Sequence, residues 1–219
     1  PNKLSNQILF GLIFAPQMTI EQQILAKSTE LFIKYGLKNL TMDEIARELG
    51  MSKKTIYQYC ENKADLIEKS MRAHIKKEEC DLMLIEGKAK NAIDETLLMF
   101  EYIMDHIRGV SGNMIYEMQK YYPKAYALFN EYTECQIQTK ISKNLERGIA
   151  EGFYRADMNA DIVSKIYISA VVFLFDQKLF LVKQYAFPDL YREFMTYHLH
   201  GILSVKGLKY VEQKKLVKK

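Results

Sequence analysis

The sequence has little cysteine and no long apolar segment, and both shortages limit what the protein can be. Its 219 residues include three cysteines, Cys60, Cys80 and Cys135, which lie far apart and form no Cys-x-x-Cys pair. Isolated cysteines, odd in number, argue against a disulfide framework and a zinc ribbon, and they suit a reducing cytoplasm. Because no apolar run approaches the roughly 20 residues that cross a bilayer, we expect no membrane contact.

Proline and glycine are also scarce, at 4 and 10 residues, so few positions interrupt regular structure. From Thr19 onward the apolar residues recur mostly at the spacing of one helix face, and no alternating strand pattern competes with it. The sequence therefore predicts an all-α protein with about nine helices. The main helices are expected over residues 20–35, 42–49, 53–59, 63–85, 89–107, 123–150, 160–181 and 188–204.

Motifs for catalysis and for metal binding are missing as well. The sequence contains no HExxH, no GxSxG, no P-loop and no paired-cysteine metal site. His198 and His200 are two residues apart, and on a helix this spacing points their side chains about 200° apart. We therefore expect no enzyme, no metal and no cofactor, with a metal-sensing regulator as the lesser alternative. The net charge of +4 permits a polyanionic partner without requiring one.

The most informative stretch runs from Leu40 to Leu66, where three helix starts are encoded. Thr41 and Glu44 have the spacing of a capping box, and Ser52 and Asn62 are suited to cap the two helices that follow. Between the first two helices, Gly50 supplies the residue that adopts positive φ without strain. Two short helices joined by a tight turn with glycine form the pattern of a DNA-binding helix-turn-helix.

The second helix of this pattern exposes residues suited to DNA. A recognition helix contacts base edges with its N-terminal turns, where lysine can donate to guanine and glutamine can pair with adenine. Hydroxyl groups and a lysine at a helix start suit phosphate oxygens. The alternative is a capped helical bundle whose basic face is only solvated. The candidate DNA-contacting residues are Thr41, Ser52, Lys53, Lys54, Thr55, Tyr57, Gln58, Tyr59 and Lys63.

This part of the sequence resembles the tetracycline-repressor (TetR) family of transcriptional regulators. The resemblance is carried by ILAKSTELF from Ile24, the Tyr-Gly pair at Tyr35, TMDEIA from Thr41, GMSKKTIYQY from Gly50 and the Asn-Lys pair at Asn62. It implies DNA contacts at all the candidates above except Ser52 and Lys53. One departure is Cys60, which stands where the family usually has phenylalanine.

The resemblance also implies a function and an assembly. Similar proteins are cytoplasmic homodimers that pair their last two helices and place two DNA-reading helices on a palindromic operator. We therefore expect a repressor that a small-molecule effector releases from DNA. The alternative is a helix-turn-helix protein without a ligand response, with an architectural or protein-interaction role.

Two further sets of candidates lie in the C-terminal half, and packing within the chain is the alternative for both. The segment 162–182 is apolar nearly all round, which a helix tolerates when both of its sides are covered. The candidate dimer residues are Val171, Phe175, Phe194 and Tyr197. Methionines and aromatic residues in the middle helices suit an adaptable effector pocket. Its candidates are Phe100, Ile103, Met104, Met114, Met118, Tyr122 and Tyr126.

The chain divides into four segments. We expect residues 18–64 to form the DNA-binding domain and residues 65–205 to form the domain for ligand binding and dimerisation. Residues 1–17 are read as a leader or a disordered extension, since Met18 looks like a natural start, and a signal peptide is the weaker alternative. The lysine-rich tail, residues 206–219, is expected to be solvated and frayed, with added non-specific DNA affinity as the alternative.

Overall fold

A computed structural model describes residues 18–106, 114–176, 179–181 and 184–214. Across these ranges the chain is helical with no strand, apart from one isolated bridge between Tyr154 and Leu203. The predicted all-α fold is confirmed. The expected leader and the last residues of the tail lie outside the described residues.

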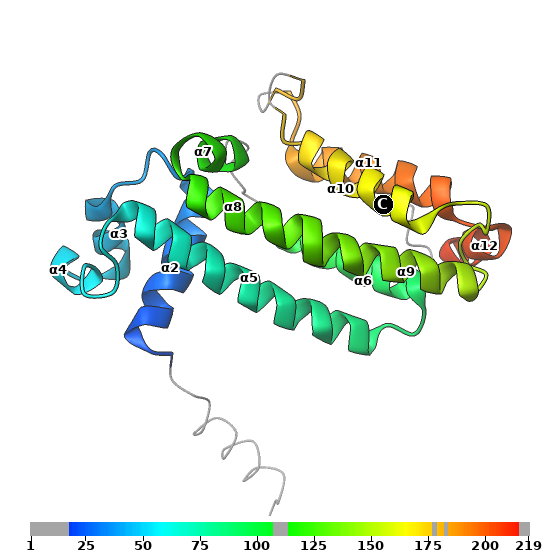
Figure 1. Cartoon of the computed structure of the whole chain (residues 1–219), viewed down its shortest axis with the longest axis horizontal. Coiled ribbons are helices and arrows are strands. Elements are labelled where there is room, and N and C mark those ends of the chain that lie inside the picture. The colour runs from blue at the N-terminus through cyan, green and yellow to red at the C-terminus, as the bar shows by residue number, and fades with distance from the viewer. Residues whose placement is uncertain (1–17, 107–113, 177–178, 182–183, 215–219) are drawn as a thin grey trace, which may run out of the picture.

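The N-terminal head consists of three helices at one end of the molecule (Figure 1). They are α2 (Ile20–Tyr35), α3 (Met42–Leu49) and α4 (Lys53–Ile56). The long helix α5 (Lys63–Lys88) leads from the head into the rest of the chain. The head is therefore joined to the larger bundle by a continuous helix.

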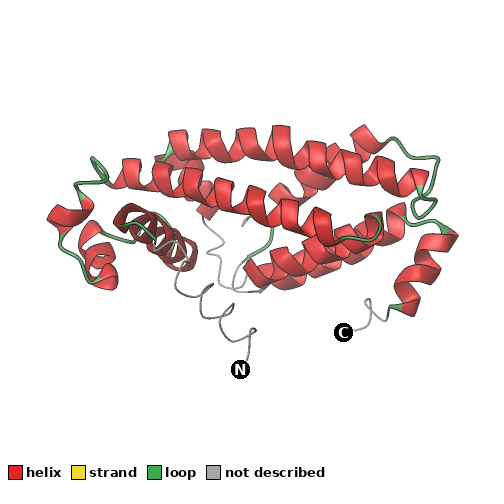
Figure 2. Ribbon diagram, turned by 90° about the horizontal axis from the view of Figure 1, so that it is seen from below, coloured by secondary structure: helices red, strands yellow, loops and turns green. Residues whose placement is uncertain are grey.

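The bundle is built from long helices that run between the head and the opposite end, where α12 lies (Figures 1 and 2). Helix α8, a π-helical segment η1 and α9 follow one another without a break and form one rod. The elements are α6 (Ala92–His106), α7 (Met114–Tyr121), α8 (Pro123–Glu131), η1 (Tyr132–Ile137), α9 (Gln138–Ala150), α10 (Ala160–Phe173), α11 (Phe187–Ile202) and α12 (Val205–Gln213).

Three clusters of buried apolar residues hold these elements together. The first lies in the head and extends to Met118 of α7 and Ala125 of α8. The second, around Leu145 and Tyr154, joins α6, α9, α11 and α12, and the third joins α6, α10 and α11 around Tyr191. Because the first cluster crosses from the head into the bundle, a shift of α7 or α8 acts directly on the packing of the head.

Two expected helices end earlier than their ranges. Helix α4 ends at Ile56, and the chain continues to Tyr59 as a turn in which the N–H groups of Gln58 and Tyr59 bond to carbonyls three residues back, at 3.2 and 2.9 Å. Helix α10 ends at Phe173 and not near residue 181. Its apolar composition continues beyond that point, so composition alone did not mark the end.

The expectation of a frayed tail is wrong for Val205–Gln213, which form α12. Ser204 caps this helix by accepting a hydrogen bond from the Gly207 N–H at 3.1 Å, and Val211 is buried at 2% exposure. Gly207 lies so close to the carbonyl oxygen of Phe153 that a side chain there would collide with it. None of the helices in the described part of the chain has the length and apolarity to span a membrane.

Candidate DNA interface

The start of α3 is held by the capping box that the sequence predicts. The Thr41 hydroxyl accepts a hydrogen bond from the Glu44 N–H at 3.2 Å, and the Thr41 N–H donates to the Glu44 carboxylate at 2.7 Å. Hydrogen bonds from the backbone and the hydroxyl of Thr41 lower the pKa of Glu44. The carboxylate therefore stays ionised at neutral pH, where it suits the positive end of the helix dipole.

The turn and the start of α4 are equally well defined. Gly50 has φ of 63°, in the left-handed region that favours glycine. The Ser52 hydroxyl accepts from the Thr55 N–H at 3.1 Å and lies 2.9 Å from the Thr55 hydroxyl. Asn62 caps α5 by accepting from the Asp65 N–H at 3.0 Å. These caps set where each short helix begins and hence where α4 points.

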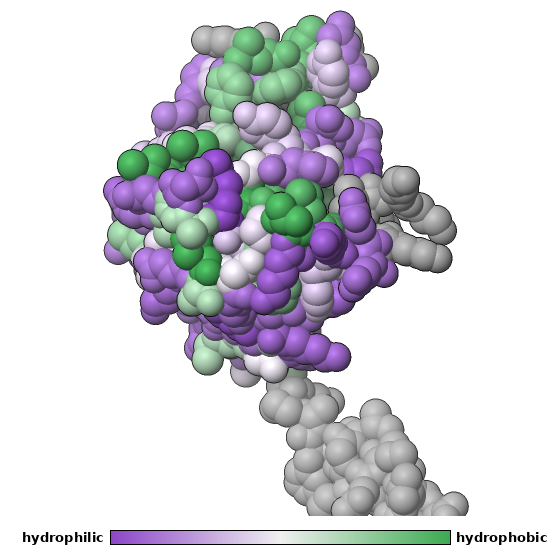
Figure 3. Space-filling view, turned by 90° about the vertical axis from the view of Figure 1, so that its right-hand side faces the viewer, coloured by the Kyte–Doolittle hydropathy of each residue, from purple (hydrophilic) through white to green (hydrophobic). Residues whose placement is uncertain are grey.

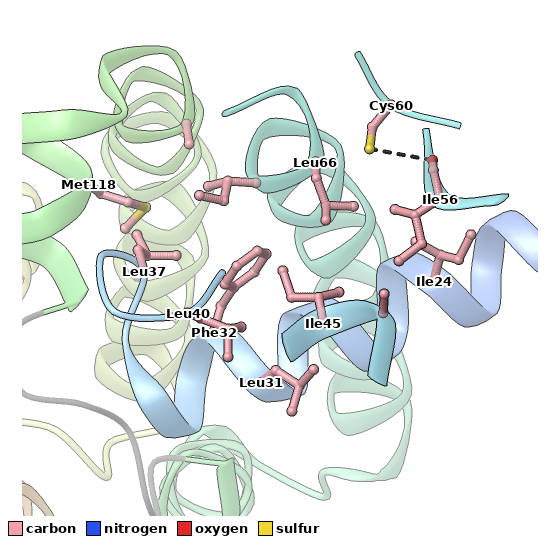
Figure 4. Packing of buried hydrophobic residues seen from close by; sticks show 13 residues of the cluster. Ile24, Leu31, Phe32, Leu37, Leu40, Ile45, Ile56, Cys60, Leu66 and Met118 are labelled. Carbon is pink, nitrogen blue, oxygen red and sulfur yellow. Dashed lines mark hydrogen bonds between the residues drawn. The ribbon is translucent and has the colours of Figure 1, made fainter. Parts of the chain in front are cut away.

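The apolar core of the head supports α4 from below (Figure 4). Ile45 of α3, Ile56 of α4 and Leu66 of α5 are fully buried and converge with Ile24 of α2. Cys60 is also buried, and its thiol donates to the Ile56 carbonyl at 3.5 Å. Burial raises the pKa of the Cys60 thiol, which keeps it neutral. The packed core of the head therefore holds the short helix α4 in place.

Three of the nine candidates are exposed and free to meet a partner. The side chains of Lys54, Tyr57 and Gln58 are exposed, and none of these three side chains makes a hydrogen bond or an ion pair within the described part of the chain. Tyr57 is 47% exposed although its ring is large and apolar. The three lie together on α4 and the turn that follows it, which is the segment a helix-turn-helix presents to the major groove.

The other candidates already have partners within the chain. Lys53 forms an ion pair with Asp43 at 2.8 Å, and Thr41, Ser52 and Thr55 take part in the caps described above. Tyr59 is half-buried against the core of the head. A DNA contact by these side chains would replace or share an existing interaction.

Lys63 lies between the head and the bundle. Its ammonium donates to the Lys38 carbonyl at 3.3 Å and sits 5.9 Å from the centre of the Tyr122 ring. Burial lowers the pKa of Lys63, against the opposing effect of the nearby Glu117 and Glu44 carboxylates. Lys63 is half-buried, so its role is partly to join α5 to the turn before α3.

Glu117 was not among the candidates, yet it makes the most direct link between α7 and the head. Its carboxylate accepts hydrogen bonds from the N–H groups of Leu37 and Lys38, at 2.7 and 2.9 Å, and the residue is 7% exposed. Nothing in the local sequence marks it, because its partners lie about 80 positions away along the chain.

The seven candidate pocket residues fall into two separate places. Phe100, Ile103 and Met104 belong to the cluster between α6, α10 and α11. Met114, Met118, Tyr122 and Tyr126 belong to the core of the head. The structure therefore does not bring them together as one pocket, and a cavity elsewhere along α6 is the better candidate for a ligand.

The four candidate dimer residues differ in how far they are exposed to solvent. Val171 and Phe194 pack within the chain, and the Phe175 ring stacks on Phe187 at 3.9 Å between ring centres. Tyr197, in contrast, is 80% exposed. Helix α10 also exposes apolar side chains that were not candidates, which are Ile162, Ile166, Val172 and Phe173.

No group of three or more metal-ligating side chains comes together among the residues that the structure describes.

Comparisons with known proteins agree with this architecture. Residues 24–69 match the family model described as bacterial regulatory proteins, tetR family. The HTH-type transcriptional regulator YvaF of Bacillus subtilis strain 168 is 21% identical over 198 residues, which cover 84% of this chain and 95% of that protein.

Solved structures share the whole fold. A protein from Saccharomonospora viridis, described as a transcriptional regulator in complex with choline, superposes with a TM-score of 0.70 at 19% identity, covering 84% of this chain and 97% of that one. The regulatory protein TetR from Rhodobacter sphaeroides gives a TM-score of 0.69 at 18% identity, covering 83% and 98%.

The capped head, its exposed recognition segment and the helical bundle define a helix-turn-helix transcriptional regulator that binds DNA. Residues 24–69 match the DNA-binding region of the tetR family, and the rest of the chain shares the fold of the solved structures named above.

Proposed function

We propose that the protein is a repressor that binds a palindromic operator as a homodimer and leaves it when a small-molecule effector binds. The observation that carries the proposal is the group Lys54, Tyr57 and Gln58, exposed and without partners on a segment whose position is set by caps. Side chains held in place but unpaired suit a surface that gains its partners from DNA. The proposal includes action in the cytoplasm and assigns no catalytic role.

The three free residues have different parts in this proposal. Lys54 and Gln58 carry the donors and acceptors that distinguish base pairs in the major groove. Tyr57 offers a hydroxyl to a phosphate oxygen, which positions the helix without reading sequence. The other six candidates support these contacts at the edge of the interface, and they are Lys53, Thr41, Ser52, Thr55, Tyr59 and Lys63. Lys53 contacts DNA only after its ion pair with Asp43 is broken.

Dimerisation is supported by a shallow apolar groove along α10. Its apolar lining is Ile162, Ile166, Ala170 and Phe173, and all of these but Ala170 are more than half exposed, at 54%, 60% and 51%. Asp161, Lys165 and Ser169 lie beside them in the groove. Apolar surface of this extent is typical of a site that another surface covers. A second copy of the chain, packed on α10 and α11, would cover it and would provide the second recognition segment.

An effector is supported by a cavity in the bundle, between α6, α9, α10 and α11. The related structure from S. viridis was determined in complex with choline, so at least one protein of this fold holds a small molecule. A ligand that binds one arrangement of the four helices better than another would change the population of the DNA-competent form.

The first test is selection of the purified protein against genomic DNA fragments at two salt concentrations. Recovery of a palindrome that survives the higher salt would support the proposal. Random fragments that are lost at the higher salt would contradict it and favour the architectural alternative, because non-specific binding is dominated by phosphate contacts.

Single substitutions then test the parts assigned to the free residues. We expect Gln58→Ala to relax the preference at particular base pairs by about 1–3 kcal/mol, and Tyr57→Ala to weaken binding to all sequences alike. Lys76→Ala, at an exposed and unpaired lysine on α5, is the matched control. Equal losses across sequences for both variants would contradict this division of roles.

A further inference from the structure

The cavity between α6, α9, α10 and α11 has a group of ring side chains in its lining, which are Phe100, Tyr167, Tyr191 and His198. The rings of Phe100 and Tyr191 are nearly parallel, with an interplanar angle of 16° and ring centres 5.8 Å apart. Tyr167 meets the edge of His198 at 4.9 Å. Met99 and Met195 add flexible side chains, and aliphatic and polar residues of α6, α9 and α11 complete the lining. Flat faces beside adaptable thioethers suit an aromatic ring.

The same cavity contains hydrogen-bonding groups that are not fully used. The hydroxyl groups of Tyr167 and Tyr191 lie 2.8 Å apart, so one donates to the other. The second O–H group of this pair then has no acceptor among the described residues. The ring nitrogens of His198 make no hydrogen bond there either. A ligand oxygen that enters the cavity would meet a free hydroxyl donor and an unpaired imidazole.

These polar groups are uncharged near neutral pH. Burial lowers the pKa of His198 to about 4, so its imidazole is neutral and offers one donor and one acceptor. Burial raises the pKa of Tyr167 to about 12 and raises that of Tyr191 well above its ordinary value. The aromatic end of the cavity therefore carries no charge that could neutralise an ionic ligand.

The charged residues at the other end of the cavity already have partners. Glu95 is paired with Arg147 and Lys140 with Glu86, each at 3.2 Å. A carboxylate ligand would find no unpaired cation, and a quaternary ammonium would find ring faces but no unpaired carboxylate. Moving an ion out of water without a counter-charge is costly, so the cavity selects against both.

We propose that this cavity binds a small neutral aromatic molecule whose hydroxyl or carbonyl oxygen is hydrogen-bonded by the Tyr167–Tyr191 pair and His198. The inference rests on the proposed function only in calling this molecule the effector. The cavity measures about 50 Å³, far below the several hundred that a bound ligand usually occupies. Binding therefore has to move Met99 or Met195 and widen the space between the four helices.

The test is isothermal titration calorimetry on the full chain without DNA, with three probes of similar size. They are 2-naphthol, which is neutral at pH 7, the anion 2-naphthoate and the cation phenyltrimethylammonium. We expect 2-naphthol to bind and both ions to bind at least tenfold more weakly. Equal or tighter binding of either ion, or no binding of 2-naphthol up to its solubility, would overturn the proposal.

Two variants test the residues within the cavity. Tyr167→Phe and His198→Phe each remove a hydrogen-bonding group and keep a ring, and we expect each to weaken 2-naphthol binding about five- to tenfold. Tyr116→Phe, at a 56% exposed tyrosine on α7, should leave the affinity unchanged. Unchanged affinity in both cavity variants, with melting curves like that of the wild type, would overturn the assignment.

This experiment separates the inference from the proposed function. Loss of ligand binding leaves the DNA selection experiment unaffected, because that experiment contains no ligand. Conversely, failure to select an operator leaves the order of affinities among the three probes as it was measured.

Discussion

Glu117 shows how one side chain can connect the two parts of the molecule. Its carboxylate accepts from the N–H groups of Leu37 and Lys38 in the turn between α2 and α3, and little solvent reaches it. The N-terminus of α3 begins only a few residues later, at Met42. A movement of α7 is therefore passed to the head through two hydrogen bonds and the packing of Met118.

Removing this carboxylate should destabilise the protein measurably. We expect Glu117→Ala to lower the free energy of unfolding by about 2–4 kcal/mol, because the buried N–H group of Leu37 and the partly buried one of Lys38 lose a charged acceptor. Glu117→Gln keeps one acceptor oxygen and should cost less. Urea denaturation gives the free energies, and hydrogen exchange should speed up at the Leu37 and Lys38 amides in particular. Glu131→Ala, at an exposed carboxylate on α8, is the control, and a loss as large there would contradict this account.

The caps and the turn of the head could be predicted from the sequence because their partners are neighbours along the chain. Thr41 and Glu44 are three positions apart, and so are Ser52 and Thr55. The partners of Glu117 are about 80 positions away, so no local pattern reveals them. The same limit applied to the pocket residues, since composition does not show which of two cores a methionine joins.

Glu78, near the middle of helix α5, has a carboxyl group that holds its proton more tightly than usual. Burial raises the pKa of Glu78 to about 7. His74 lies 3.9 Å away on the same helix, and burial lowers its pKa. The neighbouring Asp81 is paired with Lys77 at 2.6 Å and accepts from the Tyr102 hydroxyl at 3.1 Å. Near pH 6 the carboxyl group of Glu78 is largely protonated, so its contact with His74 is not a full ion pair.

This carboxyl group should make stability depend on pH in a defined direction. Between its ordinary pKa near 4.5 and its folded value of about 7, Glu78 binds more protons in the folded state, so stability falls as the pH rises through this window. His74 and His198 act in the opposite direction, because their pKa values are lowered on folding and their contribution grows as the pH rises.

Glu78→Gln isolates this effect. We expect the free energy of unfolding of the variant, relative to the wild type, to rise by about 1–3 kcal/mol between pH 5 and pH 7.5. Urea denaturation at several pH values measures it, with Glu134→Gln, at an exposed carboxylate on η1, as the control. A difference that stays constant with pH would show that Glu78 titrates normally in the folded protein.

Most helices could be predicted from apolar spacing, and the exceptions have physical reasons. The range 123–150 is one rod as expected, but a π-helical segment, η1, lies inside it and was not predicted. Helix α12 was not predicted, because its lysines made the segment resemble a solvated tail. The apolar residues Leu208 and Val211 are three positions apart, and Lys214 and Tyr210 reach Asp94 of α6, more than a hundred positions away.

The arrangement of the whole molecule leaves one recognition segment at one end and apolar surface on the bundle. Figure 3, which views the end that carries α12, shows apolar surface gathered toward the side on which α10 and α11 lie. The sequence predicted that these two helices form the dimer interface, and that prediction still awaits a test. The sequence could not identify which residues of α10 form the interface, because α10 is apolar nearly all round and its pattern does not show which side faces inward.

A charge in the middle of the exposed α10 face should separate the copies. Ile166 is 60% exposed and lies at the centre of the groove, so we expect Ile166→Glu to convert a dimer into a monomer with the same helix content. In a two-fold symmetric interface each substitution occurs twice, which doubles its cost. Sedimentation equilibrium measures the mass, and circular dichroism checks the fold.

The control is Val205→Glu, which places the same charge at a 71% exposed apolar residue on α12. This variant should remain a dimer, because Val205 does not line the groove on α10. The monomer formed by Ile166→Glu should bind a single half-site as the wild type does but lose at least tenfold in affinity for the palindrome, since its two heads no longer bind as a linked pair. A wild-type protein that is already monomeric, or an Ile166→Glu variant that stays dimeric, would mean that the α10 face is not what joins two copies on DNA.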